Sequence, residues 1–179
     1  MVTPRLWLRR WRPEDLEPFA ALNADREVME HFPSPLSREE TARAVDWVAQ
    51  HYDRHGFGVW AVEVPEQAPF IGYIGLAVPS FEASFTPCVE VGWRLARPWW
   101  GQGLATEGAQ AALAYGFERL NLPEIVSFTV PGNVRSRRVM EKLGMRYSED
   151  FEHPRIDPPH PLRRHVLYRL SRAEWASSR

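Results

Sequence analysis

The 179-residue sequence has little cysteine and almost no net charge. Its single cysteine, Cys88, excludes an internal disulfide framework and a thiolate metal cluster. The formal net charge of -1 provides no broad positive field for a phosphate backbone, so we expect no nucleic-acid partner. No apolar run approaches the roughly 18 residues of a membrane span, and the first residues lack the apolar stretch of a signal peptide. We therefore expect a cytoplasmic protein with no membrane partner.

The composition, 44% hydrophobic and 25% charged, is that of an ordinary globular chain. Its length predicts a single domain over residues 1–179. Apolar periodicity and turn residues predict strands near 6–11, 57–64, 70–78, 88–95, 125–130, 145–151 and 162–170. Helices are expected from 13 onward, over 38–55 behind a Ser37 cap, over 104–120 and over 133–143. This order predicts an α/β fold with a mixed sheet.

A glycine-bearing turn, Trp100-Gly101-Gln102-Gly103, separates the 88–95 strand from the 104–120 helix. Glycines let main-chain amides approach a ligand, and a helix amino terminus adds unpaired N–H groups and partial positive charge. These features are typical of a phosphate site. They are equally consistent with a plain tight turn, and the spacing fits neither the triphosphate nor the dinucleotide fingerprint.

Three segments together resemble the GNAT superfamily of N-acetyltransferases, and within it the Rim-type branch related to enzymes that acetylate ribosomal-protein amino termini. They are a central strand (Val89-Glu90-Val91-Gly92-Trp93-Arg94-Leu95), a loop and helix start (Trp99 to Glu107), and a helix with an Asn-x-x-Ser start and a Lys-Leu-Gly end (Asn133 to Met145). The resemblance implies an α/β GNAT fold: a mixed, about seven-stranded central sheet flanked by helices, with splayed central parallel strands.

The resemblance also implies an acetyl-CoA site without a metal. Main-chain amides around the turn would hold the pyrophosphate (Trp100, Gly101, Gln102, Gly103, Leu104, Ala105 and Thr106), and backbone groups of Trp93 and Leu95 would pair with the pantetheine arm as an added strand does. Asn133 would bind the same arm, although Asn is also a strong helix cap. The nucleotide phosphate is expected to contact at most one of three arginines, Arg135, Arg137 and Arg138.

Two residues are candidates for catalysis. Ser136 resembles the Rim-type residue that protonates the departing thiolate. Glu90 is a candidate base for the acceptor amine, with a structural ion pair as its alternative and with Glu63 and Glu82 as weaker candidates. Main-chain amides near Val91 or Gly92 would stabilise the developing oxyanion. The histidines near the carboxyl end, among them His153 and His165, match no zinc spacing and are expected in an exposed loop.

The predicted function is transfer of an acetyl group from acetyl-CoA to a primary amine, with a protein amino terminus as one acceptor, by direct attack in a ternary complex. Two alternatives remain: a small-amine acetyltransferase acting on a polyamine or aminoglycoside, and an acyl-CoA sensor without catalysis. A homodimer is left open. The acceptor is expected to enter between three irregular segments, 23–35, 79–87 and 153–161, where Phe81 and Phe85 offer apolar walls and acidic residues attract a cation.

Overall fold

The computed structural model describes residues 1–177, and its centre is a seven-stranded sheet with the order β1-β2-β3-β4-β5-β7-β6. The strands are β1 (Trp7–Arg9), β2 (Val59–Val64), β3 (Ala68–Ala77), β4 (Glu90–Leu95), β5 (Glu124–Thr129), β6 (Arg146–Glu152) and β7 (Arg164–Ser171). Neighbouring strands are antiparallel except β4 and β5, which are parallel and joined through a helix. The predicted mixed seven-stranded sheet is therefore confirmed.

Five α-helices flank this sheet within the described residues: α1 (Leu16–Ala24), α2 (Arg38–His55), α3 (Leu104–Ala114), α4 (Val134–Lys142) and α5 (Arg172–Ser177). Helix α2 begins and ends as its sequence predicts. Ser37 and Glu40 form a reciprocal capping box, and Gly56 ends the helix with φ of 76°. Short 3-10 turns, Pro13–Asp15 and Arg97–Trp99, precede α1 and α3.

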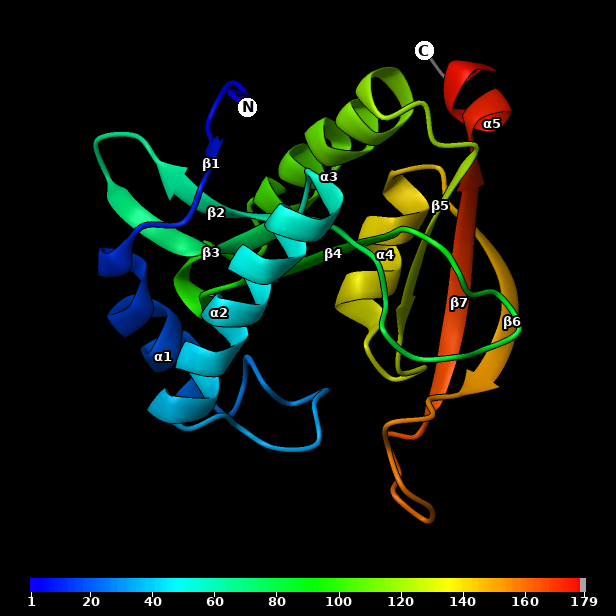
Figure 1. Cartoon of the computed structure of the whole chain (residues 1–179), viewed down its shortest axis with the longest axis horizontal. Helices are drawn as coiled ribbons and strands as arrows, with labels where there is room; N and C mark the ends of the chain where they lie inside the picture. Colours follow the sequence, from blue (N-terminus) through cyan, green and yellow to red (C-terminus); the bar gives the residue numbers. More distant parts are fainter. Residues whose placement is uncertain (178–179) are drawn as a thin grey trace.

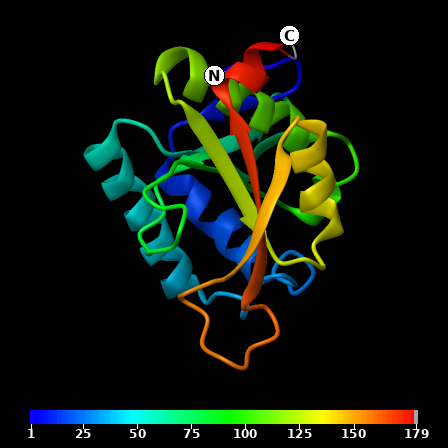
Figure 2. The ribbon, with the colours of Figure 1, turned by 90° about the vertical axis from the view of Figure 1, so that its right-hand side faces the viewer.

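The sheet consists of two halves that diverge from each other. Strands β1 to β4 form one half, and β5, β7 and β6 run steeply across the other side of the molecule (Figure 1). Seen from that side, α2 and α4 lie on opposite sides of the β5–β7–β6 half (Figure 2).

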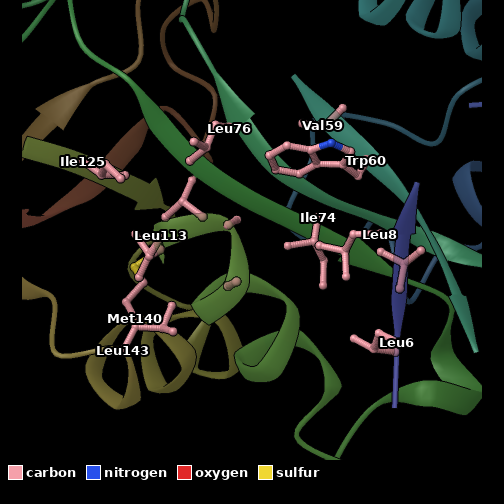
Figure 3. Packing of buried hydrophobic residues seen from close by; sticks show 14 of the residues in the cluster. Leu6, Leu8, Val59, Trp60, Ile74, Leu76, Leu113, Ile125, Met140 and Leu143 are labelled. Carbon is pink, nitrogen blue, oxygen red and sulfur yellow. The ribbon is translucent and has the colours of Figure 1, made fainter. Parts of the chain in front are cut away.

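The main core lies between the sheet and the pair α3 and α4. Leu113 and Met140 lie side by side there and Ile74 lies beside Leu8, and Ile74, Leu113 and Met140 are each at most 1% exposed (Figure 3). Helix α3 approaches the sheet closely because it carries small residues: a Cβ on Gly108 would lie 2.4 Å from the Cδ1 of Ile74. Strand β4 turns Val91 and Leu95 into this core, so Glu90, Gly92 and Arg94 face the opposite side, toward α1.

Several predicted elements differ from those observed. The 104–120 helix is α-helical only to Ala114 and ends in a π-helical turn, Tyr115–Arg119. Helix α5 was not predicted; it forms because Trp175 packs against Phe117, with ring centroids 5.5 Å apart. Phe85 is buried against Val126 and Leu167, so it is a core residue rather than a wall of a binding site. Over residues 1–177, none of the helices combines the length and the apolar character needed to cross a membrane.

Candidate active site

The site is organised by an opening between β4 and β5. The two strands pair at a single position, Glu90 with Val126, where the N–H of Val126 donates to the carbonyl of Val89 at 2.9 Å. The next link is a side chain: the hydroxyl of Ser127 donates to the carbonyl of Val91 at 2.9 Å. Beyond it the strands separate, as expected for splayed parallel strands.

Main-chain groups of β4 face this opening. The N–H of Ala96 donates to Ile71 on β3 at 2.8 Å, so alternation along an antiparallel strand directs Trp93 and Leu95 away from β3. The amide of Gly92 faces β3, and Val91 lies next to the paired position. The first main-chain amide available for an oxyanion is therefore that of Trp93, which corrects the expectation of Val91 or Gly92.

A cavity of about 580 Å³ passes through the opening and reaches both faces of the sheet. On one side it is lined by the amino-terminal ends of α3 and α4, including Gly101, Gly103 and Ser136. On the other side it is lined by Glu90, Gly92 and Arg94, by residues 27–33 and by the segment from His153 to Ile156. The structure thus joins, in one space, the predicted phosphate loop and the predicted base.

The glycine turn has the backbone that a phosphate site requires. Gly101 and Gly103 have φ of 73° and 78°, and no backbone atom lies within 4 Å of a Cβ built on either. Leu104, Ala105 and Thr106 open α3, where main-chain N–H groups have no partner in the helix because its first bond comes from Glu107 to Gly103. The turn therefore directs a set of free donors at the cavity.

Arg5 braces this turn from the amino-terminal segment. Its guanidinium donates to the carbonyl of Gln102 at 2.8 Å and to the carboxylate of Glu107 at 2.6 Å, and Thr3 donates to the same carboxylate at 2.6 Å. These contacts hold the pKa of Glu107 below its usual range, against the opposing effect of its burial, so its charge is neutralised by Arg5. The positive end of α3 is thus kept available for an anion.

Trp100 contributes differently from the prediction. Its main-chain N–H donates to Arg97 at 3.1 Å within the 3-10 turn, so that amide is already used. Its indole N–H donates to the carbonyl of Leu95 at 2.7 Å, which leaves Leu95 with its N–H, and not its carbonyl, for a ligand. The ring itself lies under the guanidinium of Arg135, 4.5 Å away. Trp100 therefore shapes the cavity wall, while Gln102 bonds through its side chain to Pro98.

Helix α4 starts at the cavity. Asn133 caps it by accepting from the N–H of Ser136 at 3.1 Å and donates to the hydroxyl of Thr129 at 3.0 Å. The hydroxyl of Ser136 lines the cavity and has no hydrogen-bond partner among residues 1–177. One helical turn apart, Arg138 and Lys142 also line it. Arg135 also lines the cavity, where it is paired with Glu30, and Arg137 bonds to Tyr168 outside it.

Glu90 lies in the cavity on the face opposite α4. Burial raises the pKa of its carboxyl to about 8, and within the described part of the chain it forms no ion pair, so the structural alternative of an arginine partner is wrong. The two weaker candidates lie elsewhere: Glu63 pairs with Arg9 at 2.7 Å, and Glu82 does not line the cavity. A carboxyl that titrates near neutral pH is suited to proton transfer.

Two histidines that the sequence placed in an exposed loop line the cavity instead. His165 is 8% exposed on β7, and its ring centroid lies 4.9 Å from that of His153. Burial lowers the pKa of both imidazoles, that of His153 to about 4. His31 reaches the cavity as well. One sequence signal could have placed His165 in the cavity: in an alternating strand over residues 164–171, His165 faces the same side as the apolar Leu167.

Two of the three segments expected to frame the acceptor entrance border the cavity. Residues from 27–33 and 153–156 line the cavity, but none from 79–87 does. That loop supports the second segment from behind: the guanidinium of Arg155 donates to the carbonyl of Ser80 at 3.1 Å, and Phe81 lies 4.7 Å from the His153 ring. The acidic residues expected to attract a cation are also elsewhere or paired, since Glu30 bonds to Arg135 at 3.0 Å.

An opened pair of parallel strands, with free helix amides on one side and a titratable carboxyl on the other, is suited to hold a phosphate-bearing molecule and to take up a proton beside it. Residues 5–146 match the family model described as the acetyltransferase (GNAT) domain. The chain belongs to this family and is an N-acetyltransferase with the GNAT fold.

Relatives cover nearly the whole chain. It is 34% identical over 181 residues to the FsC-acetyl coenzyme A-N(2)-transacetylase of Aspergillus fumigatus. The matched region covers 97% of this chain and 76% of that protein. A GNAT acetyltransferase structure from Bacillus anthracis is 25% identical, with a TM-score of 0.79 over 97% of this chain and 98% of its own. The spermidine N-acetyltransferase of Vibrio cholerae, solved with CoA and spermine, shares the fold at 20% identity and a TM-score of 0.76 over 97% and 99% of the two chains.

Proposed function

We propose that this protein acetylates a primary amine on a small molecule, using acetyl-CoA, by direct transfer in a ternary complex. The observation that carries the proposal is the cavity of about 580 Å³, which connects the free amides of the glycine turn to the Glu90 face through the opening between β4 and β5. A thioester entering from one face and an amine entering from the other would meet in that opening, where alignment alone provides a large part of the rate.

The residues present fit acetyl-CoA. The free amides from Gly101 to Thr106 suit a pyrophosphate, and Arg138 and Lys142 supply positive charge nearby on α4. The main chain of Trp93 would pair with the pantetheine arm in the way an added strand pairs. Bound there, acetyl-CoA supplies an acetyl thioester, the activated group that the amine attacks.

Three groups of the chain would act on the reaction. The amide of Trp93 would stabilise negative charge on the carbonyl oxygen while the amine nitrogen bonds to the carbonyl carbon. The hydroxyl of Ser136 would give a proton to the sulfur as the C–S bond breaks. Glu90 would accept the proton that the amine nitrogen loses. Ser136 would regain a proton from solvent as Glu90 releases one, so that free amine and thioester become acetylated amine and free thiol with no net change in protons.

The acceptor is proposed from the shape of the site and from one relative. The amine side of the cavity is bordered by two segments, 27–33 and 153–156, which suits a small acceptor. The name of the Aspergillus relative describes acetyl transfer to an N(2) position. The Rim-type expectation of a protein amino terminus has only the sequence motifs as its support, and it becomes one arm of the test.

Turnover of acetyl-CoA against a panel of amines and peptides tests the proposal, with free thiol and acetylated product measured together. We expect stoichiometric thiol and acetylamine with a small amine. Acetylation confined to peptides would support the Rim-type arm instead. Tight acetyl-CoA binding without transfer to any amine or peptide would contradict the proposal and indicate a sensor.

A further inference from the structure

Arg94 is a cation without a counter-ion on the amine side of the cavity. Its guanidinium lies over the ring of Phe32, 4.0 Å from the centroid, and 5.5 Å from that of Tyr73; both rings line the cavity. It donates one hydrogen bond, to the side-chain oxygen of Asn23 at 2.6 Å, and its Nε is buried without a partner. Within residues 1–177, no carboxylate lies at ion-pair distance from Arg94.

The guanidinium is held in place by a buried support. Asn23 is 0% exposed, and its amide donates to the hydroxyl of Thr41 at 3.1 Å, which fixes the side-chain oxygen that faces Arg94. Its main-chain carbonyl accepts from Leu36 at 2.9 Å. A flexible surface arginine would need no such support, and a neutral amide does not balance the charge of a partly buried guanidinium.

The acids around Arg94 are already neutralised by other groups. Glu27 pairs with Arg97 at 2.7 Å, and Glu30 pairs with Arg135 at 3.0 Å. Glu90, on the same face of β4, keeps its proton near neutral pH because burial raises the pKa of its carboxyl to about 8. The amine side of the cavity therefore carries a net positive potential at Arg94, which suits an anionic group and repels a polyamine.

We propose that Arg94 binds a carboxylate of the acceptor, so that the acceptor is an amino acid or a small amino-acid derivative and not a polyamine. The planar guanidinium suits a planar carboxylate. Gly92, next to the transfer point, lies two residues from Arg94 on the same face, about 7 Å along the strand. An amine at the opening and a carboxylate at Arg94 would thus be a few bonds apart. The inference rests on the proposed function.

Matched acceptors test it. Each L-amino acid is compared with the amino alcohol of the same side chain, which keeps a similarly basic amine and lacks the carboxylate; spermidine and O-phosphoethanolamine are added. We expect the best amino acid to exceed its alcohol in kcat/KM by at least about tenfold, as loss of one charged contact predicts. Arg94→Gln should bring this ratio near one through KM while leaving acetyl-CoA affinity unchanged, and Arg94→Lys should give an intermediate ratio.

Arg38→Gln is the matched control, because Arg38 also ties its element to α1, through Glu17, and lies outside the cavity. It should keep the wild-type ratio. If Arg94→Gln does not fold, Phe32→Leu, which removes the ring under the guanidinium, should lower the ratio in the same direction. A ratio near one in the wild type, an unchanged ratio in these variants, or a preference for spermidine or O-phosphoethanolamine would overturn the inference.

A binding measurement separates this inference from the proposed function. Isothermal titration of amino acids into the CoA-saturated protein reports carboxylate binding without turnover. Binding that Arg94→Gln abolishes, with no acetylation of any amine or peptide, would support the carboxylate subsite and contradict the proposed function. Turnover of amines without Arg94-dependent binding of amino acids would support the proposed function and contradict the carboxylate subsite.

Discussion

Ser127 on β5 donates its hydroxyl to the carbonyl of Val91 on β4 at 2.9 Å, at the point where the two parallel strands separate. A side chain thus takes the place of the next main-chain bond of the ladder. The strands are joined there and yet kept apart beyond it, since a hydroxyl on a side chain spans a wider gap than a direct strand pair. The opening that accepts the pantetheine arm in our proposal begins at this bond.

Ser127→Ala should therefore lower the free energy of unfolding by about 1 to 3 kcal/mol, because it leaves the Val91 carbonyl buried without a partner. Ser148→Ala is the matched control. Ser148 lies on β6, where its exposed hydroxyl accepts from Arg169 of β7, and its loss should lower the free energy of unfolding by under about 0.5 kcal/mol. Urea denaturation of both variants measures the difference. Equal, small effects would mean that the bond does not stabilise the edge of the opening.

Gly103→Val should weaken acetyl-CoA binding at least about tenfold, since it places a branched side chain among the free amides of the turn. Gly144→Val isolates this effect from backbone strain. Gly144 has φ of 80° against 78° for Gly103, and it ends α4 away from the turn. Calorimetric titration should show lost affinity only in the first variant, although both lose stability. A similar loss in both would attribute the effect to strain.

Ser136→Ala should lower kcat by about 100-fold, the lower range for a general acid, with little change in acetyl-CoA affinity. Stability should hold, because Asn133 caps α4 by accepting from the main-chain N–H of residue 136, which the substitution retains. Steady-state kinetics and titration together test the split between rate and binding. An unchanged kcat would leave Ser136 with a structural part only.

Glu90 should give kcat/KM an acidic limb with an apparent pKa near 8, along which the rate falls as the pH drops, because burial raises the pKa of its carboxyl from 4.5 to about 8 and only the ionised form accepts a proton. Glu90→Gln should remove that limb and leave the one set by the acceptor amine. A rate profile from pH 6 to 10 tests this. An identical profile in the variant would exclude Glu90 as the base.

Stability offers a second, independent measurement on Glu90. The unfolded carboxyl ionises near pH 4.5 and the folded one near 8, so the stability contributed by the protonated group is complete below 4.5 and is lost as the pH rises to 8. The stability of Glu90→Gln relative to wild type should therefore rise over that window.

His51 should make the fold sensitive to acid. Its Nε2 accepts from the N–H of Val78 at 2.9 Å, which requires an unprotonated nitrogen, while Nδ1 contacts the carbonyl of Phe57 at 2.9 Å. Burial lowers its pKa from 6.5, so its stabilising effect is complete above pH 6.5 and is lost as the pH falls below that value. Urea denaturation between pH 8 and 5 should show this loss, reduced in His51→Gln and retained in His55→Gln.

The sequence predicted elements whose signals are local. The pair Ser37 and Glu40 with Gly56 fixes both ends of α2, and Asn133 with Ser136 marks the start of α4. The alternation of β4 separated the core residue Val91 from Glu90 and Gly92 on the cavity face. Each of these depends on residues within a few positions of one another, which periodicity and capping rules describe directly.

What the sequence did not predict depends on distant contacts. His165 reaches the cavity because β7 lies beside β5, and the guanidinium of Arg94 is held there by Asn23 of α1, 71 positions away. The main-chain amide of Trp100 was expected to be free, but the 3-10 turn Arg97–Trp99 uses it, through the carbonyl of Arg97. Helix α5 is short, and its formation depends on the Phe117 ring beneath Trp175. No local pattern carries these partners.

The bracing of the glycine turn by Arg5 links two regions that the sheet order sets far apart. Arg5 lies two residues before β1, the edge strand, and β1 lies three strands from β4. Fraying of that edge would release the carbonyl of Gln102 and the carboxylate of Glu107 together. By thermodynamic reciprocity, whatever binds only the ordered turn must also lower the equilibrium population of the frayed edge. Amide deuterium exchange in β1 would then report occupancy of a pocket on the other side of the sheet, with no probe attached to the pocket itself.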